Sequence, residues 1–513
     1  MTIGPTLGTG LFVGTGQALA VGGPASLIFS YVFISALVYC VTTGIAEVST
    51  HSIGRNGALI SHTYHYTSSH LGFAITYLRW CTLAVMVPFE VTTAMVHLGL
   101  WTPGSDIALR MGLVMGVIFG FNMLPDKVFR RSQSFFTGLK FVVTTSLISM
   151  AGYVAIRDDP SRPVKGFHYW SQPGPFNEYL ARGDFGRFLG MIYCLLCSTI
   201  TVVFIPELTV QRAEKHDGEQ GNSIFRFTRN SNLVMFVLYI MTAVSATIMA
   251  PYTDQSLTND GIGAGLSPYT VGARDSGIRA LHTAAVAMIL LSSVASGRSF
   301  LHLSSRMLAN MAEAGHAPAM FMVRNRWNVP YISVAISAGF AWLTFLCMVM
   351  SSSAVHNYLM FFITTSCYIS WICSCLTYIR FRRAVTRAEI VPVHRSFVQP
   401  FGTWFALITS VLLITLNLSL IVIAPRYQFN PRNAIPAHVA VGMFSTMYLS
   451  HRLITGIRKK TSQMEASNDD DVETLAERTR GQAMELQKRK REGEGSAAVG
   501  PNGQSSYGWA NAD

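Results

Sequence analysis

The sequence predicts an all-α integral membrane protein. Half of its 513 residues are hydrophobic, only 13% are charged, and apolar runs recur along most of the chain, a composition that excludes a soluble enzyme. A helix needs about 20 apolar residues to cross the hydrocarbon core of a bilayer. An opening apolar segment is followed by eleven such stretches, near residues 27–48, 73–99, 109–124, 135–156, 187–210, 231–250, 281–305, 330–350, 357–379, 402–424 and 434–455.

The opening segment, residues 3–16, reads IGPTLGTGLFVGTG and contains five glycines and a proline. Glycines four residues apart, such as Gly4 and Gly8, let transmembrane helices pack closely, which is one interpretation. Pro5 lacks an amide hydrogen and the glycines relax the backbone, so a broken helix is the alternative. Lipid tolerates such a break only around a protein-lined cavity. Freed amides there can hold an anion and freed carbonyls a cation, and an amino acid carries both charges.

A second candidate break lies in the sixth span, where residues 201–211 read TVVFIPELTVQ. Pro206 cannot donate a hydrogen bond to the carbonyl of Val202, so we expect this acceptor to be free; an ordinary kink is the alternative. Glu207 follows, and a carboxylate inside a membrane span is costly and typically functional. Breaks in the first and sixth spans occupy corresponding positions of two five-span halves, which is typical of an inverted-repeat transporter.

The basic residues follow a pattern that is typical of membrane topology rather than of nucleic-acid binding. The net charge is +12, but lysines and arginines are not gathered into a folded soluble region. Cytoplasmic loops of membrane proteins are enriched in them. We therefore expect residues 351–357, which contain neither, to lie outside, and these clusters to lie inside: Lys127, Arg130 and Arg131; Arg212, Lys215, Arg226 and Arg229; Arg380, Arg382, Arg383 and Arg387.

The cysteines and histidines predict no metal or cofactor site. All eight cysteines fall in apolar stretches, and we interpret Cys194 and Cys197 as packing thiols rather than as a metal or redox pair. For His62, His65 and His70 a solvated or interfacial helix face is favoured over a metal site. Because no nucleophile-base pairing or nucleotide-binding loop stands out either, the sequence does not predict an enzyme.

The chain changes character near its end. Residues 1–455 form the predicted membrane domain. Residues 456–513 are charged and then rich in glycine and serine, which predicts a mostly disordered cytoplasmic tail.

Several segments resemble the fungal amino acid permeases of the amino acid-polyamine-organocation superfamily. The opening IGPTLGTGLFVGTG is similar to their IGGTIGTGLFVGSG. The segment LGFAITYLRWCTLAVMVPFEVTTAM resembles their third span, with its proline and glutamate at Pro88 and Glu90. The segments SSRMLANMAEAGHAP, YISWICSCLTYIRFRRA and PFGTWFAL resemble further motifs, so the resemblance runs from about residue 3 to 455.

This resemblance implies twelve spans, arranged as a five-plus-five inverted repeat with broken first and sixth helices and followed by two further helices. It also implies proton-coupled uptake of amino acids. Backbone amides at the first break would hold the substrate carboxylate, carbonyls at both breaks would hold its ammonium group, and buried carboxylates would couple transport to protons. The residues implied are Gly8, Thr9 and Gly10 for the amides, Thr6, Val202 and Phe204 for the carbonyls, and Glu207 and then Glu90 for coupling. A purely structural role is the alternative for each carboxylate.

Three departures from the family pattern affect this scheme. The family carries half a helix before the glycine-rich break, whereas this sequence begins within two residues of it. We therefore expect the natural start to lie upstream and the first span to be truncated here; a truly truncated protein, without transport, is the alternative. In the sixth span Thr201 replaces an aromatic gate and Ile205 replaces a glycine, which changes the shape of the pocket. In the eighth span Arg298 and Phe300 replace an asparagine and an acidic or small polar residue.

A buried arginine is expensive and needs a partner, and Glu90 and Glu207 are the candidates for Arg298. An Arg298 that faces the cavity could replace a proton-linked cation or recognise an acidic substrate. One that snorkels to the interface has little functional weight. Arg79, in the third span, raises the same question.

The leading hypothesis is a plasma-membrane amino acid permease that works by alternating access and is driven by protons. Its expected partners are an amino acid, protons and the lipid bilayer, with no nucleic acid. A permease-like amino acid receptor with little transport is the alternative, and sustained, saturable uptake would discriminate between them. Because all amino acids share the same backbone zwitterion, the break motif does not select among them.

Overall fold

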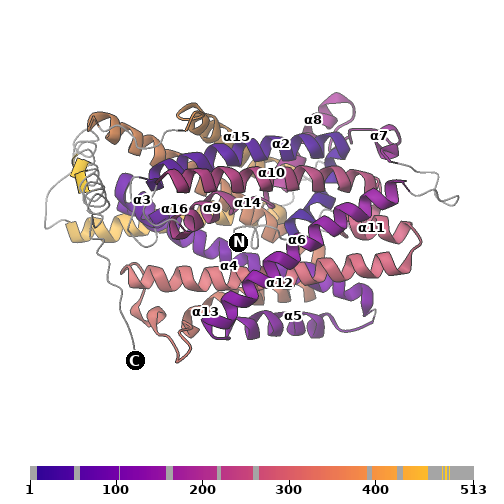
Figure 1. Cartoon of the computed structure of the whole chain (residues 1–513), viewed down its shortest axis with the longest axis horizontal. Helices are drawn as coiled ribbons and strands as arrows, with labels where there is room; N and C mark the ends of the chain where they lie inside the picture. Colours follow the sequence, from indigo (N-terminus) through magenta and orange to yellow (C-terminus); the bar gives the residue numbers. More distant parts are fainter. Residues whose placement is uncertain are drawn as a thin grey trace, which may run out of the picture.

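The computed structural model describes residues 9–50, 58–102, 104–156, 166–216, 221–257, 265–389, 396–423 and 431–459, together with residues 477, 480, 481, 484 and 485. Every regular element in this part of the chain is a helix, and most of the long helices run side by side along a common direction (Figure 1). The 3₁₀-helices are η1 (Thr9–Leu11), η2 (Gln255–Leu257), η3 (Ala319–Met322) and η4 (Phe340–Met348). The α-helices are α2 (Gly14–Thr50), α3 (Ala58–Tyr66), α4 (Ser69–Trp101), α5 (Ile107–Asn122), α6 (Asp126–Ile156), α7 (His168–Ser171), α8 (Asp184–Thr199), α9 (Ile205–His216), α10 (Gly221–Met249), α11 (Pro268–Asp275), α12 (Arg279–Glu313), α13 (Tyr331–Gly339), α14 (Ser352–Arg387), α15 (Phe401–Ile423) and α16 (Pro431–Lys459).

Eight helical segments of the described chain are long enough and apolar enough to cross a bilayer. They lie in α2, α4, α6, α10, α12, α14 and α15 and in the continuous run of α13 and η4. The prediction of an all-helical membrane protein is confirmed at this level. The stretch expected at 187–210 is divided between α8 and α9, with a non-helical turn between them.

α2 contains a sharp turn at Gly23, which lies between the first two predicted spans. Gly23 has φ 80° and ψ 175°, a backbone conformation that glycine adopts without a steric penalty. Pro24 follows and has no backbone N–H to donate. The N–H of Ala25 instead donates to the carbonyl of Pro175 at 2.9 Å, in the segment before α8. The turn thus separates a short helix after the first break from the long helix that follows.

α2 and α4 occupy the interior of the bundle. α2 packs against α8, α9 and α10, and α4 packs against α12, α14 and α16. Most side chains of both helices are buried. Helices that are apolar on all faces are typical of such interior positions. The start of α2 and the middle of α4, which carry most of the residues considered below, are therefore shielded from the surroundings.

The histidine-rich segment differs from its prediction. His62 is only 3% exposed, so the interpretation of this residue as part of a solvated face is wrong. The reason is that α3 packs against α2, α4 and α14, and His62 Nε2 lies 3.3 Å from Ser49 Oγ of α2. Burial lowers the pKa of His62 to about 3. All eight cysteines are buried and free, and the described residues contain no group of three or more potential metal ligands.

Candidate substrate site at two helix breaks

Two helix interruptions form the centre of the candidate site. Two turn residues separate η1 from the start of α2, and residues 200–204 form a turn between α8 and α9. Pro206 is the second residue of α9, a position where the missing N–H removes no intrahelical hydrogen bond. Pro206 therefore begins a new helix after the interruption instead of kinking a continuous one.

The two interruptions touch each other through glycine. A Cβ added at Gly10 would lie 3.5 Å from the carbonyl oxygen of Ile200 and 3.5 Å from Cα of Thr201. A Cβ added at Gly14 would lie 3.0 Å from Cγ2 of Ile200, which is tighter than ordinary side-chain contacts. The missing side chains thus let the backbones of two distant segments meet inside the bundle.

The first interruption also presents the start of a helix. The first N–H groups of an α-helix have no acceptor within the helix and carry the positive end of its dipole. α2 begins at Gly14, directly after η1 and its two turn residues. Of the residues predicted here, Thr9 opens η1 and Gly10 is buried, whereas Gly4, Pro5, Thr6 and Gly8 lie outside the described residues.

The carbonyls of the second interruption already accept hydrogen bonds. The prediction that Pro206 leaves the carbonyl of Val202 free is wrong, because this oxygen accepts the N–H of Ile205 at 3.1 Å. The turn replaces the lost helical bond with one from a residue three positions along the chain. The carbonyl of Phe204 accepts the N–H of Leu208 at 3.0 Å. Each oxygen keeps a second lone pair with which it can accept another hydrogen bond.

Thr201, which is predicted to replace an aromatic gate, is held by a hydroxyl network. Its hydroxyl donates to the carbonyl of Ser198 at 2.8 Å, and its carbonyl accepts the hydroxyl of Tyr239 at 3.2 Å. Tyr31 lies 2.7 Å, oxygen to oxygen, from the hydroxyl of Thr15 near the start of α2. Its ring also packs against that of Tyr239. The surroundings of the two interruptions are therefore neutral and partly aromatic.

Glu207 forms a buried ion pair with Arg79. The Oε1 atom of Glu207 lies 3.0 Å from Nη2 of Arg79 and accepts a hydrogen bond from Ser370 Oγ at 2.5 Å. Arg79 donates from Nε to Ser370 Oγ at 2.9 Å and from Nη2 to Ser374 Oγ at 3.1 Å. The pair connects α9, which follows the second interruption, to α4 and α14.

Arg298 occupies a different environment, between α12, α5 and α6. Its guanidinium group donates to Ser132 Oγ at 2.7 Å and to Gln133 Oε1 at 2.6 Å. It also lies 4.5 Å from the ring centres of Phe129 and Phe136, within the range of cation–π attraction. Polar and aromatic groups together compensate for the burial of this charge.

These contacts correct two sequence-based alternatives for Arg298. Glu207 is not its partner, because that carboxylate pairs with Arg79. Arg298 does not snorkel to an interface, since its exposed fraction is 0%. Its charge instead acts on Lys140, a residue of α6 that the sequence analysis missed and that also interacts electrostatically with Glu90.

Lys140 is buried and donates from Nζ to Ser296 Oγ at 2.6 Å. A lone lysine in the apolar run GLKFVVTT was the signal that could have identified it, because ionisable side chains inside membrane spans are rare. Glu90 lies at the same place in the bundle, with its Cβ 3.4 Å from a Cβ built at Gly297. Glu90, Lys140 and Arg298 thus form one buried group of charges, separate from the Arg79–Glu207 pair.

The helical architecture and the number of apolar segments define a multi-pass integral membrane protein. The sequence profile of the family described as "Amino acid permease" matches residues 1–464, so the chain belongs to the amino acid permease family. Its function is the transport of amino acids across a membrane, and the family consists of transporters rather than enzymes.

Two relatives and one solved structure illustrate this similarity. The chain is 29% identical over 487 residues to a proline-specific permease of Emericella nidulans, covering 93% of this chain and 88% of that protein. It is 24% identical to a lysine/arginine permease of Candida albicans, covering 90% and 80%. A crystal structure of the Eremococcus coleocola manganese transporter has the same overall fold, with a TM-score of 0.56, 15% identity and coverage of 92% and 95%.

Proposed function

We propose that this permease is a proton symporter that works by alternating access. Its spans would form a five-plus-five inverted repeat with interrupted first and sixth helices, followed by two further helices. The observation that carries this proposal is the contact of Gly10 with Ile200 and Thr201, because paired interruptions at membrane depth are typical of transporter binding sites. Residues 1–455 would be the transport domain, and 456–513 a cytoplasmic tail.

The substrate would bind through its backbone charges at the two interruptions. N–H groups before α2 would hold the carboxylate, supported by the helix dipole. Carbonyl oxygens of both interruptions would hold the ammonium group. A carbonyl that already accepts one hydrogen bond would do so through its second lone pair. The residues proposed are Gly8, Thr9 and Gly10 for the carboxylate and Thr6, Val202 and Phe204 for the ammonium group, with Thr201 at the gate.

We infer that the preferred substrate has an uncharged side chain, such as proline. The described side chains around the interruptions are apolar or neutral, including Ile200, Thr201 and Tyr31. The charges of Arg79 and Glu207 neutralise each other in their ion pair. Among these described side chains, an additional charge on a substrate would meet no opposite charge to compensate for its desolvation. The relative named as proline-specific agrees with this inference.

Proton coupling would act through Glu207, with Glu90 as a second site. A proton on Glu207 would remove its negative charge and therefore the ion pair with Arg79, releasing α9 from α4 and α14. α9 leads into the basic segment that the charge pattern places in the cytoplasm, so this release would open the inner side. Glu90, which interacts electrostatically with Lys140, would be the second site of proton binding.

Uptake measurements test this function directly. Cells without their own amino acid permeases would express the chain and receive labelled proline, arginine or aspartate at external pH 5 and pH 7.5. Accumulation of proline above equilibrium, greater at pH 5 and abolished by a protonophore, is expected. Surface labelling should find the protein in the plasma membrane. Protein that reaches the surface and binds amino acids without uptake would instead be a receptor.

A further inference from the structure

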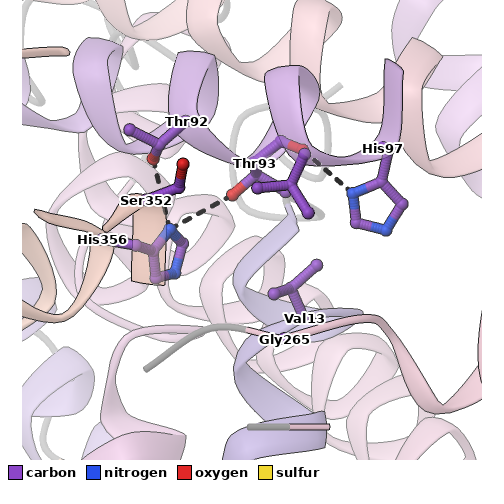
Figure 2. Close-up of a pocket in the computed structure, with 8 residues that line it drawn as sticks. Val13, Thr92, Thr93, His97, Gly265, Ser352 and His356 are labelled. Atoms are coloured by element: carbon purple, nitrogen blue, oxygen red, sulfur yellow. Dashed lines mark hydrogen bonds between the residues drawn. The ribbon is translucent and has the colours of Figure 1, made fainter. Parts of the chain in front are cut away.

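A small cavity lies between α4, α14 and the residue just before α2, apart from the charged groups described above. Val13, Thr92, Thr93, His97, Ser352 and His356 contribute to its lining (Figure 2). Its volume accommodates about one water molecule. Residues 351–357, at the start of α14, are predicted to lie outside, so the cavity is on the outer side of the substrate site.

The hydrogen bonds of His97 determine which of its ring nitrogens carries hydrogen. Nδ1 lies 2.9 Å from the carbonyl oxygen of Thr93, and a carbonyl can only accept. Nδ1 is therefore the protonated nitrogen, and in the neutral ring Nε2 is an acceptor. His97 is 0% exposed, and its Nε2 is buried without a hydrogen-bond partner among the described residues. A buried acceptor of this kind requires a donor.

The same reasoning applies to His356. The hydroxyl groups of Thr92 and Thr93 donate their single hydrogens to the carbonyl of Phe89, at 2.8 and 3.1 Å. They can then only accept from His356 Nδ1, which lies 3.3 and 3.4 Å away. Nε2 of His356 is consequently an acceptor as well. In Figure 2 the second ring nitrogen of each histidine points away from these threonine contacts, on the side of Val13.

Among its described lining residues, the cavity thus presents two basic nitrogens and no compensating charge. Among the described residues that line the cavity, only His97 and His356 have titratable side chains. Titratable groups on the elements packed around the cavity include Glu90, two turns before His97 on α4, Cys347 on η4, which interacts with Ser352, and Tyr269 of α11, whose ring contacts Phe12. A positive charge is therefore disfavoured while the cavity is sealed and becomes tolerable once water enters it.

We propose that His97 and His356 form an outer proton-binding site, in which an external proton binds the Nε2 atom of one of the two rings. In the neutral site a water in the cavity donates a hydrogen to Nε2 of His97, the buried acceptor without a partner among the described residues. An incoming proton binds Nε2 of one ring, and the new N–H then donates a hydrogen bond to water in the cavity. This inference rests on the proposed proton symport and adds the place where external protons enter.

Conformational change would link this site to transport. The outward-open state, with water at the cavity, takes up the proton, whereas closure disfavours the charge and expels it. Glu90 is the only carboxylate of α4 and lies seven residues from His97, about 10 Å along the helix axis. It is thus placed to receive the proton on the inward side of the cavity.

The test uses the full-length chain and the variants His97→Gln and His356→Gln. The matched control is His282→Gln, since His282 lies near the start of α12 and does not line the cavity. Initial uptake of a subsaturating mixture of labelled amino acids would be measured between external pH 4.5 and 8. A single required proton changes this rate by up to about tenfold per pH unit. The control should retain the wild-type slope, and both cavity variants should lose most of it.

Two further measurements separate the possible failures. Exchange of labelled for unlabelled amino acid at one fixed pH should be retained in both cavity variants, which shows that they are folded. Thermal stabilisation of the purified protein by the same mixture, followed against pH, reports binding without transport. A pH-dependent stabilisation that vanishes in both variants would support the histidine site even if wild type did not accumulate substrate. Cavity variants with wild-type pH profiles in both assays would overturn it.

Discussion

Arg79 Nη2 lies 3.0 Å from Oε1 of Glu207, and both side chains are nearly shielded from solvent, with exposed fractions of 6% and 7%. The pair joins α4 to α9, and Ser370 of α14 donates to the same carboxylate oxygen. Breaking a buried ion pair by removing one partner typically costs about 3–5 kcal/mol. The contact therefore holds the helix after the second interruption in place, and anything that neutralises Glu207 weakens that hold.

The variant Glu207→Gln tests whether this contact couples transport to protons. Glutamine cannot change its charge with pH, so we expect proton-driven accumulation to be lost, while exchange of amino acid across the membrane remains. The measurement is uptake of labelled proline into cells at external pH 5 and 7.5, beside exchange at constant pH. A surface control is Glu178→Gln, whose carboxylate lies 3.9 Å from Arg187 and is 41% exposed. Accumulation with a wild-type pH profile in Glu207→Gln would remove this residue from the coupling role.

The double variant Arg79→Gln/Glu207→Gln separates coupling from stability. Glu207→Gln alone leaves the Arg79 guanidinium buried without a counter-charge, which we expect to lower stability by about 3 kcal/mol. Removing both charges should restore part of this loss, because no uncompensated charge remains. Thermal denaturation of the purified proteins measures both effects. A double variant less stable than Glu207→Gln would show that the buried charge of Arg79 is not what destabilises the single variant.

Gly10→Val addresses the contact between the two interruptions. Even a Cβ at Gly10 would lie 3.5 Å from the carbonyl oxygen of Ile200, so the two further methyl groups of valine would displace the turn or fill the site. We expect loss of substrate binding with folding retained. Gly112→Val is the matched control, because a Cβ at this glycine of α5 meets nothing within 4 Å. Binding follows from thermal stabilisation by proline, and unchanged affinity in Gly10→Val would return the glycine to a role in helix packing.

Local features of the sequence predicted more of the site than long-range contacts did. Glycines and Pro206 indicated the two interruptions because their effect on the backbone is local. The prediction of a free carbonyl at Val202 is wrong because proline removes one helical hydrogen bond, whereas the turn supplies another from the N–H of Ile205, three residues along the chain. Whether Glu207 pairs with Arg79 or with Arg298 depends on how α4, α9 and α12 pack. No spacing in a single sequence encodes that packing.

The environment of Arg298 predicts a structural role. Its hydrogen bonds to Ser132 and Gln133 and its position between Phe129 and Phe136 involve no residue of the two interruptions. We therefore expect Arg298→Gln to lower the stability of the purified protein by about 3 kcal/mol through lost charge-assisted hydrogen bonds and cation–π attraction.

Substrate preference should be unchanged in Arg298→Gln, as measured by competition of unlabelled amino acids with labelled proline. Arg326→Gln provides the comparison, since Arg326 makes an exposed cation–π contact with Trp327 and should contribute little. A shift of Arg298→Gln toward basic or acidic competitors would place this arginine in the recognition of substrate.

A second ion pair, between Glu47 of α2 and Arg382 of α14, predicts an asymmetric response to substitution. Arg382 Nη1 lies 2.9 Å from Glu47 Oε1, and the hydroxyl of Tyr378 donates to Oε2 at 3.2 Å. Glu47 is fully buried, whereas the Arg382 side chain is 21% exposed. Arg382→Gln therefore removes a positive charge beside a fully buried carboxylate and is expected to lower stability measurably.

Glu47→Gln should cost less than Arg382→Gln, because a neutral amide can still accept from Tyr378 and the partly exposed Arg382 can turn toward water. Thermal denaturation of the two purified variants gives the order. Equal losses would mean that the pair acts mainly through the geometry of the α2–α14 contact. A larger loss in Glu47→Gln would contradict the assignment of Glu47 as the more strongly buried charge.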